Sequence, residues 1–212
     1  MRLRDALPAI LSSFLLIGSA RAATIWDEAI NGDLSNAQAT PTPVTLGAGT
    51  NSVFGTLRTS ASTDFQDWIA VTVPAGLQLT QYVHVAYAST DNQGFTGFQA
   101  GSSFVGSTNS PGSYNGYAHY GPLATNGSIN SGAPTSTIGV DLLTFMKNEA
   151  GVTGYTAPLQ AGTYTFLVQQ TGAAATSYQF NFNVAPVPEP ATAGVLSLIA
   201  TMLVSSRRRL GR

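Results

Sequence analysis

Cysteine is absent from this chain of 212 residues. Its absence excludes disulfide bonds, thiolate metal sites and catalysis by a cysteine nucleophile. A chain of this length can bury enough apolar surface to fold without such cross-links. We therefore expect a hydrophobic core to hold the fold, with no cofactor and no dependence on zinc or reducing agents.

Charged residues are also scarce, at 9% of the chain, against roughly 25% in an ordinary soluble domain. Most arginines lie near the two ends, so Arg58 and Lys147 are the only basic residues between positions 23 and 186. Eight acidic residues in that range against these two basic ones give a formal charge of −6. Nucleic-acid binding needs a basic surface that displaces counterions, so the composition predicts no nucleic-acid partner.

Signatures of the common catalytic sites are missing as well. The chain has no G-x-S-x-G elbow, no H-E-x-x-H zinc motif and no Walker phosphate loop. Its two histidines, His84 and His119, stand outside any such motif, and we expect both to be solvated or structural. The sequence therefore predicts a protein that is not an enzyme, with a secreted hydrolase as the less favoured alternative.

The N-terminal segment has the three parts of a secretory signal peptide. Arg2 and Arg4 form a basic start, a short apolar run follows, and Ala20 and Ala22 make a small-x-small cleavage site. The apolar run is too short for a membrane anchor. The pattern predicts a signal peptide over 1–22, cleaved after Ala22, and export of the remainder.

The C-terminal segment combines a proline-flanked glutamate, an apolar stretch and a basic cluster. Pro188 and Pro190 keep the peptide around Glu189 extended and accessible. A helix over 191–206 is short for a hydrocarbon core of about 30 Å but can span it under strain, with the arginines of 207–212 on the cytoplasmic side. A plain linker before a permanent anchor is the alternative interpretation.

The order of these features resembles the PEP-CTERM sorting signal of Gram-negative bacteria. Here the motif is Val187-Pro188-Glu189-Pro190, and the basic cluster is Arg207-Arg208-Arg209. The resemblance covers 187–212 and implies recognition by exosortase, a membrane cysteine transpeptidase-like enzyme. It also implies transient insertion in the inner membrane, and an association with exopolysaccharide and biofilm. We expect a final location in the cell envelope, at the cell surface or in the extracellular matrix.

Between the two signals, segments with strict alternation of polar and apolar residues predict half-buried strands. The clearest are GTYTFLVQQTG (162–172) and TSYQFNFNV (176–184), and the segment from Gly172 to Thr176 between them predicts a hairpin with a loose loop. The face expected in the core carries four aromatic side chains: Tyr164, Phe166, Phe180 and Phe182.

Further strands are expected over 51–57, 68–73 and 77–87, with a turn at Pro74-Ala75-Gly76. In the last of these, His84 is expected on the face opposite the apolar one. That apolar face is expected to carry Leu77, Leu79, Val83, Val85 and Tyr87, with Gln81 as its one exception. Short strands punctuated by glycine and proline predict an antiparallel β-sandwich.

The pairing of TDFQDWIAVTVPAGLQLT with the two late strands resembles bacterial pre-peptidase C-terminal (PPC-type) domains. The resemblance implies an all-β, jelly-roll-like sandwich over 23–186. Residues 95–158 exceed what so compact a domain needs and are rich in Gly, Ser and Asn, which indicates long loops. One short helix is expected from Asp141 to Lys147, capped by Asp141 and ended by Gly151, with a strand over 138–145 as the alternative.

Three aspartates are weak candidates for a calcium site: Asp64, Asp67 and Asp91. The alternative is that Asp64 and Asp67 cap the turn before the strand at Trp68.

Three tyrosines in the glycine-rich stretch GSYNGYAHYG, namely Tyr114, Tyr117 and Tyr120, are weak candidates for stacking on a sugar. The alternative is that they cover an edge of the sandwich.

Taken together, the sequence predicts an exported structural or adhesive protein of the matrix, with a carbohydrate-binding module as the alternative.

Overall fold

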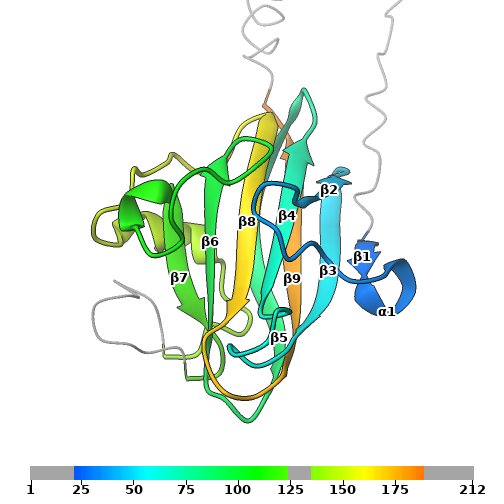
Figure 1. Ribbon diagram of the computed structural model, residues 1–212. Helices are drawn as coiled ribbons and strands as arrows, with labels where there is room; N and C mark the ends of the chain where they lie inside the picture. Colours follow the sequence, from blue (N-terminus) through cyan, green and yellow to red (C-terminus); the bar gives the residue numbers. More distant parts are fainter. Residues whose placement is uncertain (1–21, 124–134, 189–212) are drawn as a thin grey trace, which may run out of the picture.

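The computed structural model describes residues 22–123 and 135–188, and these residues form two β-sheets (Figure 1). The first sheet contains, in order, β1 (Ala23–Asp27), β3 (Gly49–Leu57), β9 (Thr176–Pro186) and β5 (Leu77–Ala88). The second sheet contains β2 (Thr42–Thr45), β4 (Gln66–Val73), β8 (Gly162–Gln170), β6 (Gly94–Ala100) and β7 (Gly116–Tyr120). Helical elements are short: α1 (Glu28–Asn31) and the 3-10 turns η1 (Pro111–Ser113), η2 (Leu142–Thr144) and η3 (Met146–Asn148). The prediction of an all-β sandwich is confirmed for these residues.

Two strand pairs are parallel, in contrast to the expected antiparallel arrangement. These pairs are β1 with β3 and β2 with β4, at one edge of each sheet. The chain alternates between the sheets from β1 to β5, so a strand meets its neighbour only after a crossing through the other sheet. Such a crossover permits parallel pairing, which a tight hairpin does not.

The predicted hairpin of the two late strands is wrong. β8 lies between β4 and β6 in the second sheet, whereas β9 lies between β3 and β5 in the first. The segment between them, 171–175, crosses from one sheet to the other. Alternation marks a strand with one buried face, but it does not say which strand becomes the neighbour.

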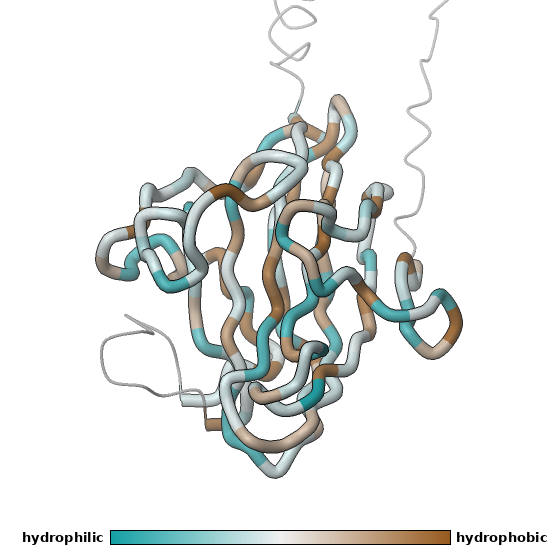
Figure 2. Tube along the Cα trace, in the orientation of Figure 1, coloured by the Kyte–Doolittle hydropathy of each residue, from teal (hydrophilic) through white to brown (hydrophobic). Residues whose placement is uncertain are grey.

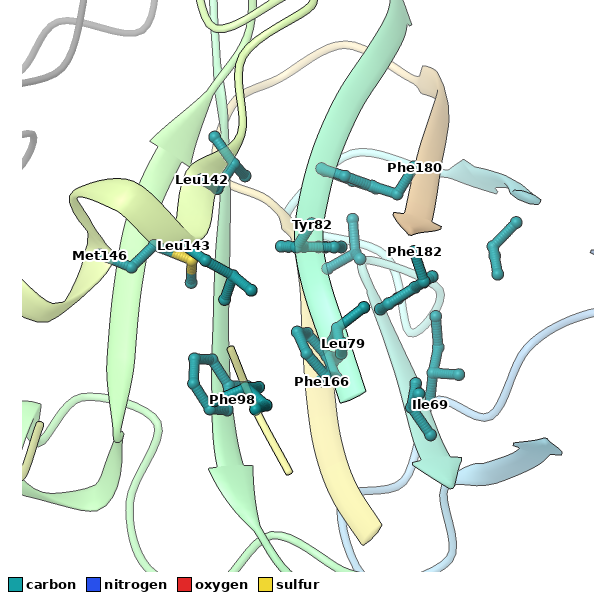
Figure 3. Packing of buried hydrophobic residues seen from close by; sticks show 14 of the residues in the cluster. Ile69, Leu79, Tyr82, Phe98, Leu142, Leu143, Met146, Phe166, Phe180 and Phe182 are labelled. Carbon is teal, nitrogen blue, oxygen red and sulfur yellow. The ribbon is translucent and has the colours of Figure 1, made fainter. Parts of the chain in front are cut away.

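The main core lies between the sheets, where aromatic side chains from both meet (Figure 3). Tyr82 of β5 is central: its ring centroid lies 4.9 Å from that of Phe166, 4.7 Å from that of Phe180 and 4.9 Å from that of Phe182. The burial predicted for these three phenylalanines is confirmed, whereas Tyr164 is only partly buried. Along the tube, hydrophobic residues recur on the central strands and are sparser in the outer loops (Figure 2).

The outer face of the second sheet is also partly covered. Trp68 and Leu167 point away from the main core and pack with Phe104 and Tyr114 in a smaller cluster. The ring centroids of Trp68 and Phe104 lie 5.0 Å apart. Part of the long glycine-rich segment therefore folds over this sheet as its second apolar layer.

Strand β5 contains two register shifts that reverse its faces. They lie between Leu79 and Gln81 and between His84 and Ala86. As a result His84 is fully buried with Leu79 and Tyr82, and the prediction that it lies opposite the apolar face is wrong. Each shift adds one residue against the partner strand, which moves the following side chains to the other face. The break in alternation at Gln81 was the only sequence sign of this change.

The helix expected from Asp141 to Lys147 forms as two short 3-10 helices, η2 and η3, in place of one continuous helix. The alternative strand is reduced to an isolated bridge from Asp141 to Val83. The Asp141 carboxylate accepts hydrogen bonds from the amides of Leu143 (3.1 Å) and Tyr82 (2.9 Å). The predicted capping role of Asp141 is therefore confirmed, and the same side chain fastens the turns to β5 at its first register shift.

Candidate functional site

The boundaries of the sandwich coincide with the boundaries expected from the two export signals. β1 begins at Ala23, directly after the predicted cleavage position, and Ala22 is exposed. β9 ends at Pro186, and the amide of Val187 still donates to the Gly76 carbonyl oxygen at 2.9 Å. Val187 and Pro188 are exposed, so the expected sorting motif starts at the surface of the fold. The other residues of both signals lie outside the described residues: Ala20, Glu189, Pro190, Arg207, Arg208 and Arg209.

The three tyrosines proposed for sugar stacking lie in or beside β7, the last strand of the second sheet. Tyr114 and Tyr120 are 1% and 0% exposed, so neither can offer its face to a sugar, and that prediction is wrong for both. Tyr117 is partly exposed. Glycines make room for the buried rings: a Cβ atom at Gly94 would lie 2.6 Å from the Tyr120 ring, and one at Gly97 would lie 2.6 Å from the Tyr114 ring. The alternative, that these residues cover an edge of the sandwich, agrees with the position of Tyr120 in the edge strand β7, whereas Tyr114 packs on the outer face of the second sheet.

His84 is a structural residue of the main core. Its Nε2 lies 3.1 Å from the Ala86 carbonyl oxygen, which can only accept, so the neutral ring carries its proton there. Nδ1 lies 2.9 Å from the Thr137 hydroxyl and accepts from it. Burial lowers the pKa of His84 to about 4, because the charged imidazolium is poorly solvated among Tyr120 and Phe180.

This buried histidine predicts a loss of stability in acid. The unfolded chain protonates His84 near its ordinary pKa of about 6.5, whereas the folded chain resists protonation until about pH 4. The stabilisation is present above pH 6.5 and is lost as the pH falls toward 4. Between pH 7 and 4.5 we expect the wild type to lose about 2–3 kcal/mol more unfolding free energy than His84→Gln. Urea denaturation at both pH values measures this difference, and equal losses in the two proteins would contradict it.

The three aspartates proposed for calcium separate into different environments. Asp91 accepts hydrogen bonds at Oδ2 from the Ala174 amide (2.6 Å) and the Gln170 side chain (3.2 Å), so it fastens the crossing from β8 to β9. Asp64 precedes β4 and pairs with Arg58, whose Nε lies 3.3 Å from Oδ2. Its carbonyl oxygen accepts from the Arg58 amide at 2.7 Å, in agreement with a role in the turn.

Asp67 lies inside β4 and is fully buried, so its interpretation as a turn cap is wrong. The Tyr178 hydroxyl donates to its Oδ2 at 2.6 Å, across the interior from β9. Its other carboxylate oxygen, Oδ1, is buried and has no hydrogen-bond partner among the described residues.

Asp67 meets two acidic residues from the N-terminal part of the fold. One carboxylate oxygen from each of Glu28, Asp33 and Asp67 lies within 4.8 Å of the other two, and we call these three residues the acidic cluster. Glu28 begins α1, which lies beside β1 at the edge of the first sheet (Figure 1). Asp33 lies in the connection from α1 to β2 and is exposed.

Glu28 is held firmly in place. Its Oε1 accepts from the Leu34 amide at 3.0 Å, and its Oε2 accepts from the Thr56 amide at 2.6 Å and the Thr56 hydroxyl at 2.8 Å. These bonds join α1 to the segment that follows it and to β3. An open cleft of about 460 Å³ adjoins Glu28 and Asp33, and Asp64 and Arg58 also line it.

The surroundings of the acidic cluster disfavour the ionised form of its carboxyl groups. Burial raises the pKa of Asp67 well above its usual range, and the neighbouring Glu28 charge raises it further. Burial also raises the pKa of Glu28, against its hydrogen bonds from Leu34 and Thr56. Arg58 forms a salt bridge with Asp64, outside the cluster, and the Arg58 side chain is 74% exposed.

The sequence pointed to Asp67 but missed Glu28 and Asp33, which lie more than 30 residues earlier in the chain. One available signal was the density of acidic residues just after the predicted cleavage position, at Asp27, Glu28 and Asp33.

Residues 22–123 and 135–188 include no helix with the length and apolarity needed to cross a membrane. Searches against known protein families, curated proteins and solved structures found no match to this chain.

Proposed function

We propose that the chain is exported, processed at its C-terminal motif and retained as a structural or adhesive, non-enzymatic protein of the envelope or extracellular matrix. The observation that carries this proposal is the order of the sequence signals around one folded unit. A signal-peptide pattern precedes Ala23, and a proline-flanked glutamate, an apolar stretch and three arginines follow Pro186. The described strands begin and end at these two positions. Removal of both signals would therefore leave the sandwich whole.

The proposed partner in processing is an exosortase-like enzyme of the inner membrane. A protease-like cleft binds an extended peptide most readily when the peptide is exposed and free of helix. Val187 and Pro188 are exposed and lie outside any helix or strand. The two prolines disfavour helix in the residues that precede them. This arrangement supports access of the enzyme to the motif without unfolding of β9.

A finer assignment of the fold, as a jelly-roll-like sandwich related to PPC-type domains, belongs to the same proposal. The inner strands pair in nested fashion along the chain, β3 with β9 and β4 with β8, while β6 pairs with both β7 and β8. Early and late strands are neighbours in this way in two stacked Greek keys. The isolated bridge from Asp141 to Val83 lies beside β5, at the edge of the first sheet.

One surface supports the alternative of a carbohydrate-binding module. Hydroxyl and amide side chains form a hydrogen-bonded ladder across β3, β9 and β5 on the outer face of the first sheet. Thr50 donates to Asn183 (2.9 Å), Ser52 donates to Asn181 (2.8 Å), and Asn183 donates to Gln81 (2.8 Å). These uncharged groups suit the hydroxyls of a neutral polysaccharide, although such cross-strand pairs also stabilise the sheet itself.

Fractionation of the producing cells tests the proposal. We expect the protein in the envelope and matrix fractions and expect its release when an exopolysaccharide-degrading enzyme disperses the matrix. Recovery in the cytoplasm, or retention that the enzyme does not change, would contradict the association. The double variant Asn181→Ala/Asn183→Ala separates the two readings, with Gln169→Ala on the second sheet as control. Release of the double variant alone before enzyme treatment would favour sugar binding by the ladder, and equal retention would favour a structural role.

A further inference from the structure

We propose that the acidic cluster of Glu28, Asp33 and Asp67 binds a calcium ion, with Asp64 as a neighbouring carboxylate. The proposal concerns the folded domain alone and is independent of export and sorting. It differs from the grouping suggested by the sequence, because Asp91 does not belong to this cluster.

The first argument is an incomplete set of bonds at Asp67. This side chain is 0% exposed, and only its Oδ2 has a partner, the Tyr178 hydroxyl. Its Oδ1 is buried without a hydrogen bond among the described residues. A buried carboxylate oxygen without a donor is costly, and an ion bound between Asp67, Glu28 and Asp33 would supply the missing partner.

The second argument is distance. Calcium binds oxygen ligands at about 2.3–2.6 Å, so two oxygens on opposite sides of one ion lie about 5 Å apart. One carboxylate oxygen from each of Glu28, Asp33 and Asp67 lies within 4.8 Å of the other two, which a single ion can bridge. The adjoining open cleft gives the ion and its remaining water ligands a route to the site from solvent.

The third argument is charge. Three carboxylates converge here and Asp64 lies close by, but the Arg58 guanidinium that lines the cleft forms its salt bridge with Asp64 and not with the three cluster residues. Like charges at this separation repel one another and raise the pKa values of Asp67 and Glu28, in addition to the larger effect of burial. A bound divalent cation would attract the carboxylates and so favour their ionised form.

The chemistry of the ligands selects calcium among common ions. The cluster offers carboxylate oxygens and no histidine or cysteine, which disfavours zinc and copper. Its members come from a short helix, a connecting segment and a strand, and all three also accept hydrogen bonds. Such an irregular set suits calcium, which tolerates variable geometry, better than magnesium, which demands a near-ideal octahedron.

Calcium at this position would join the N-terminal segment to the body of the sandwich. Glu28 follows an edge strand of the first sheet, whereas Asp67 lies in an inner strand of the second. A bound ion would therefore stabilise the folded chain by fastening β1 and α1 across the two sheets. Binding to the folded state alone raises the melting temperature in proportion to the logarithm of the calcium concentration.

Calorimetric titration and thermal unfolding of the full-length chain, first treated with a chelator, test the proposal with CaCl₂ and MgCl₂ as probes. At a calcium concentration 100 times the dissociation constant, we expect the melting temperature to rise by about 5–10 °C. Magnesium at the same concentration should have a clearly smaller effect. No rise with calcium in the wild type would overturn the proposal.

Two variants place the site. Asp33→Asn changes an exposed residue, and we expect it to weaken calcium binding by about tenfold or more while the fold stays intact. Asp67→Asn keeps an oxygen that can accept from Tyr178, so its unfolding temperature in chelator should equal or exceed that of the wild type, because it removes a costly charge. Its response to calcium should disappear.

Asp91→Asn is the control, since it also removes one negative charge but at an aspartate outside the cluster. We expect this variant to keep the full calcium response, whatever its baseline stability. A loss as large as that of Asp33→Asn would mean that calcium screens the general negative charge of the domain, and would overturn the assignment. An unchanged response in both Asp33→Asn and Asp67→Asn would overturn it as well.

Discussion

Phe180→Ala is expected to lower the free energy of unfolding by about 3–5 kcal/mol, the usual range for truncation of a buried phenylalanine. Phe180 is 1% exposed and lies on the inner face of β9. Its ring centroid lies 4.7 Å from that of Tyr82, 5.0 Å from that of Tyr120 and 5.2 Å from that of His84. Truncation would leave a cavity among rings from two strands, β5 of the first sheet and β7 of the second, and rigid aromatic neighbours cannot fill it fully.

The neighbouring residue provides the control. Gln179 lies on the outer face of the same strand, is partly exposed, and donates one hydrogen bond to Asn181 at 3.2 Å. We expect Gln179→Ala to cost under about 0.5 kcal/mol, as exposed substitutions usually do. Urea denaturation of the full-length chain measures both variants. Equal shifts of the two midpoints would contradict the division of β9 into a core face and a solvent face.

The alternation of side chains predicted strands where one face is buried. It located β8 and β9 and identified Phe166, Phe180 and Phe182 as core residues, because a period of two is a local property of the backbone. It could not predict that these strands belong to different sheets. Strand pairing depends on contacts between residues far apart in the chain, such as Val53 with Phe180, which local periodicity does not encode.

The prediction of buried side chains failed in β5, where contacts with distant parts of the chain interrupt the regular alternation of inward and outward residues. The register shift near Gln81 buries His84, and the Asp141 side chain accepts the Tyr82 amide that follows the shift. A distant contact also explains why the sequence fitted a helix and a strand in the Asp141 segment. Neither local pattern takes account of the hydrogen bond from the Tyr82 amide of β5 to the Asp141 carboxylate.

The members of the acidic cluster could likewise not be grouped from the sequence, because they are far apart in the chain. Asp64 and Asp67 were predicted as neighbours because they are close in sequence, yet the fold places Asp67 beside Glu28 and Asp33.

The prediction for the tyrosine stretch was wrong because residues outside the stretch decide whether its rings are exposed. Its glycines suggested an open loop, whereas Gly94 and Gly97 on the adjacent strand β6 provide the space that buries Tyr120 and Tyr114.

Glu189→Ala is expected to leave export intact but to trap a full-length form of the protein in the inner membrane. The prediction assigns separate tasks to three parts of the tail. The prolines keep Val187 to Pro190 accessible to the enzyme. In the sorting proposal the apolar stretch over 191–206 would hold the chain in the membrane until cleavage, and Arg207, Arg208 and Arg209 would stop its passage.

Substitution of those three arginines by alanine is the companion variant and should have a different effect. Each arginine opposes entry into hydrocarbon by about 2.5–3.5 kcal/mol on insertion scales. Without them we expect the tail to slip or to insert wrongly, although the motif itself is unchanged. The two variants therefore separate recognition of the motif from retention in the membrane.

Intact-mass analysis of the native protein and of Glu189→Ala, each from inner-membrane and matrix fractions, tests export and sorting most directly. We expect the native protein in the matrix fraction, with its N-terminus at Ala23 and without the apolar tail. We expect Glu189→Ala in the inner membrane, with the same N-terminus and the complete tail. A native protein that keeps its full tail in the inner membrane, and that Glu189→Ala does not change, would show that the tail is a permanent anchor and would contradict the sorting proposal.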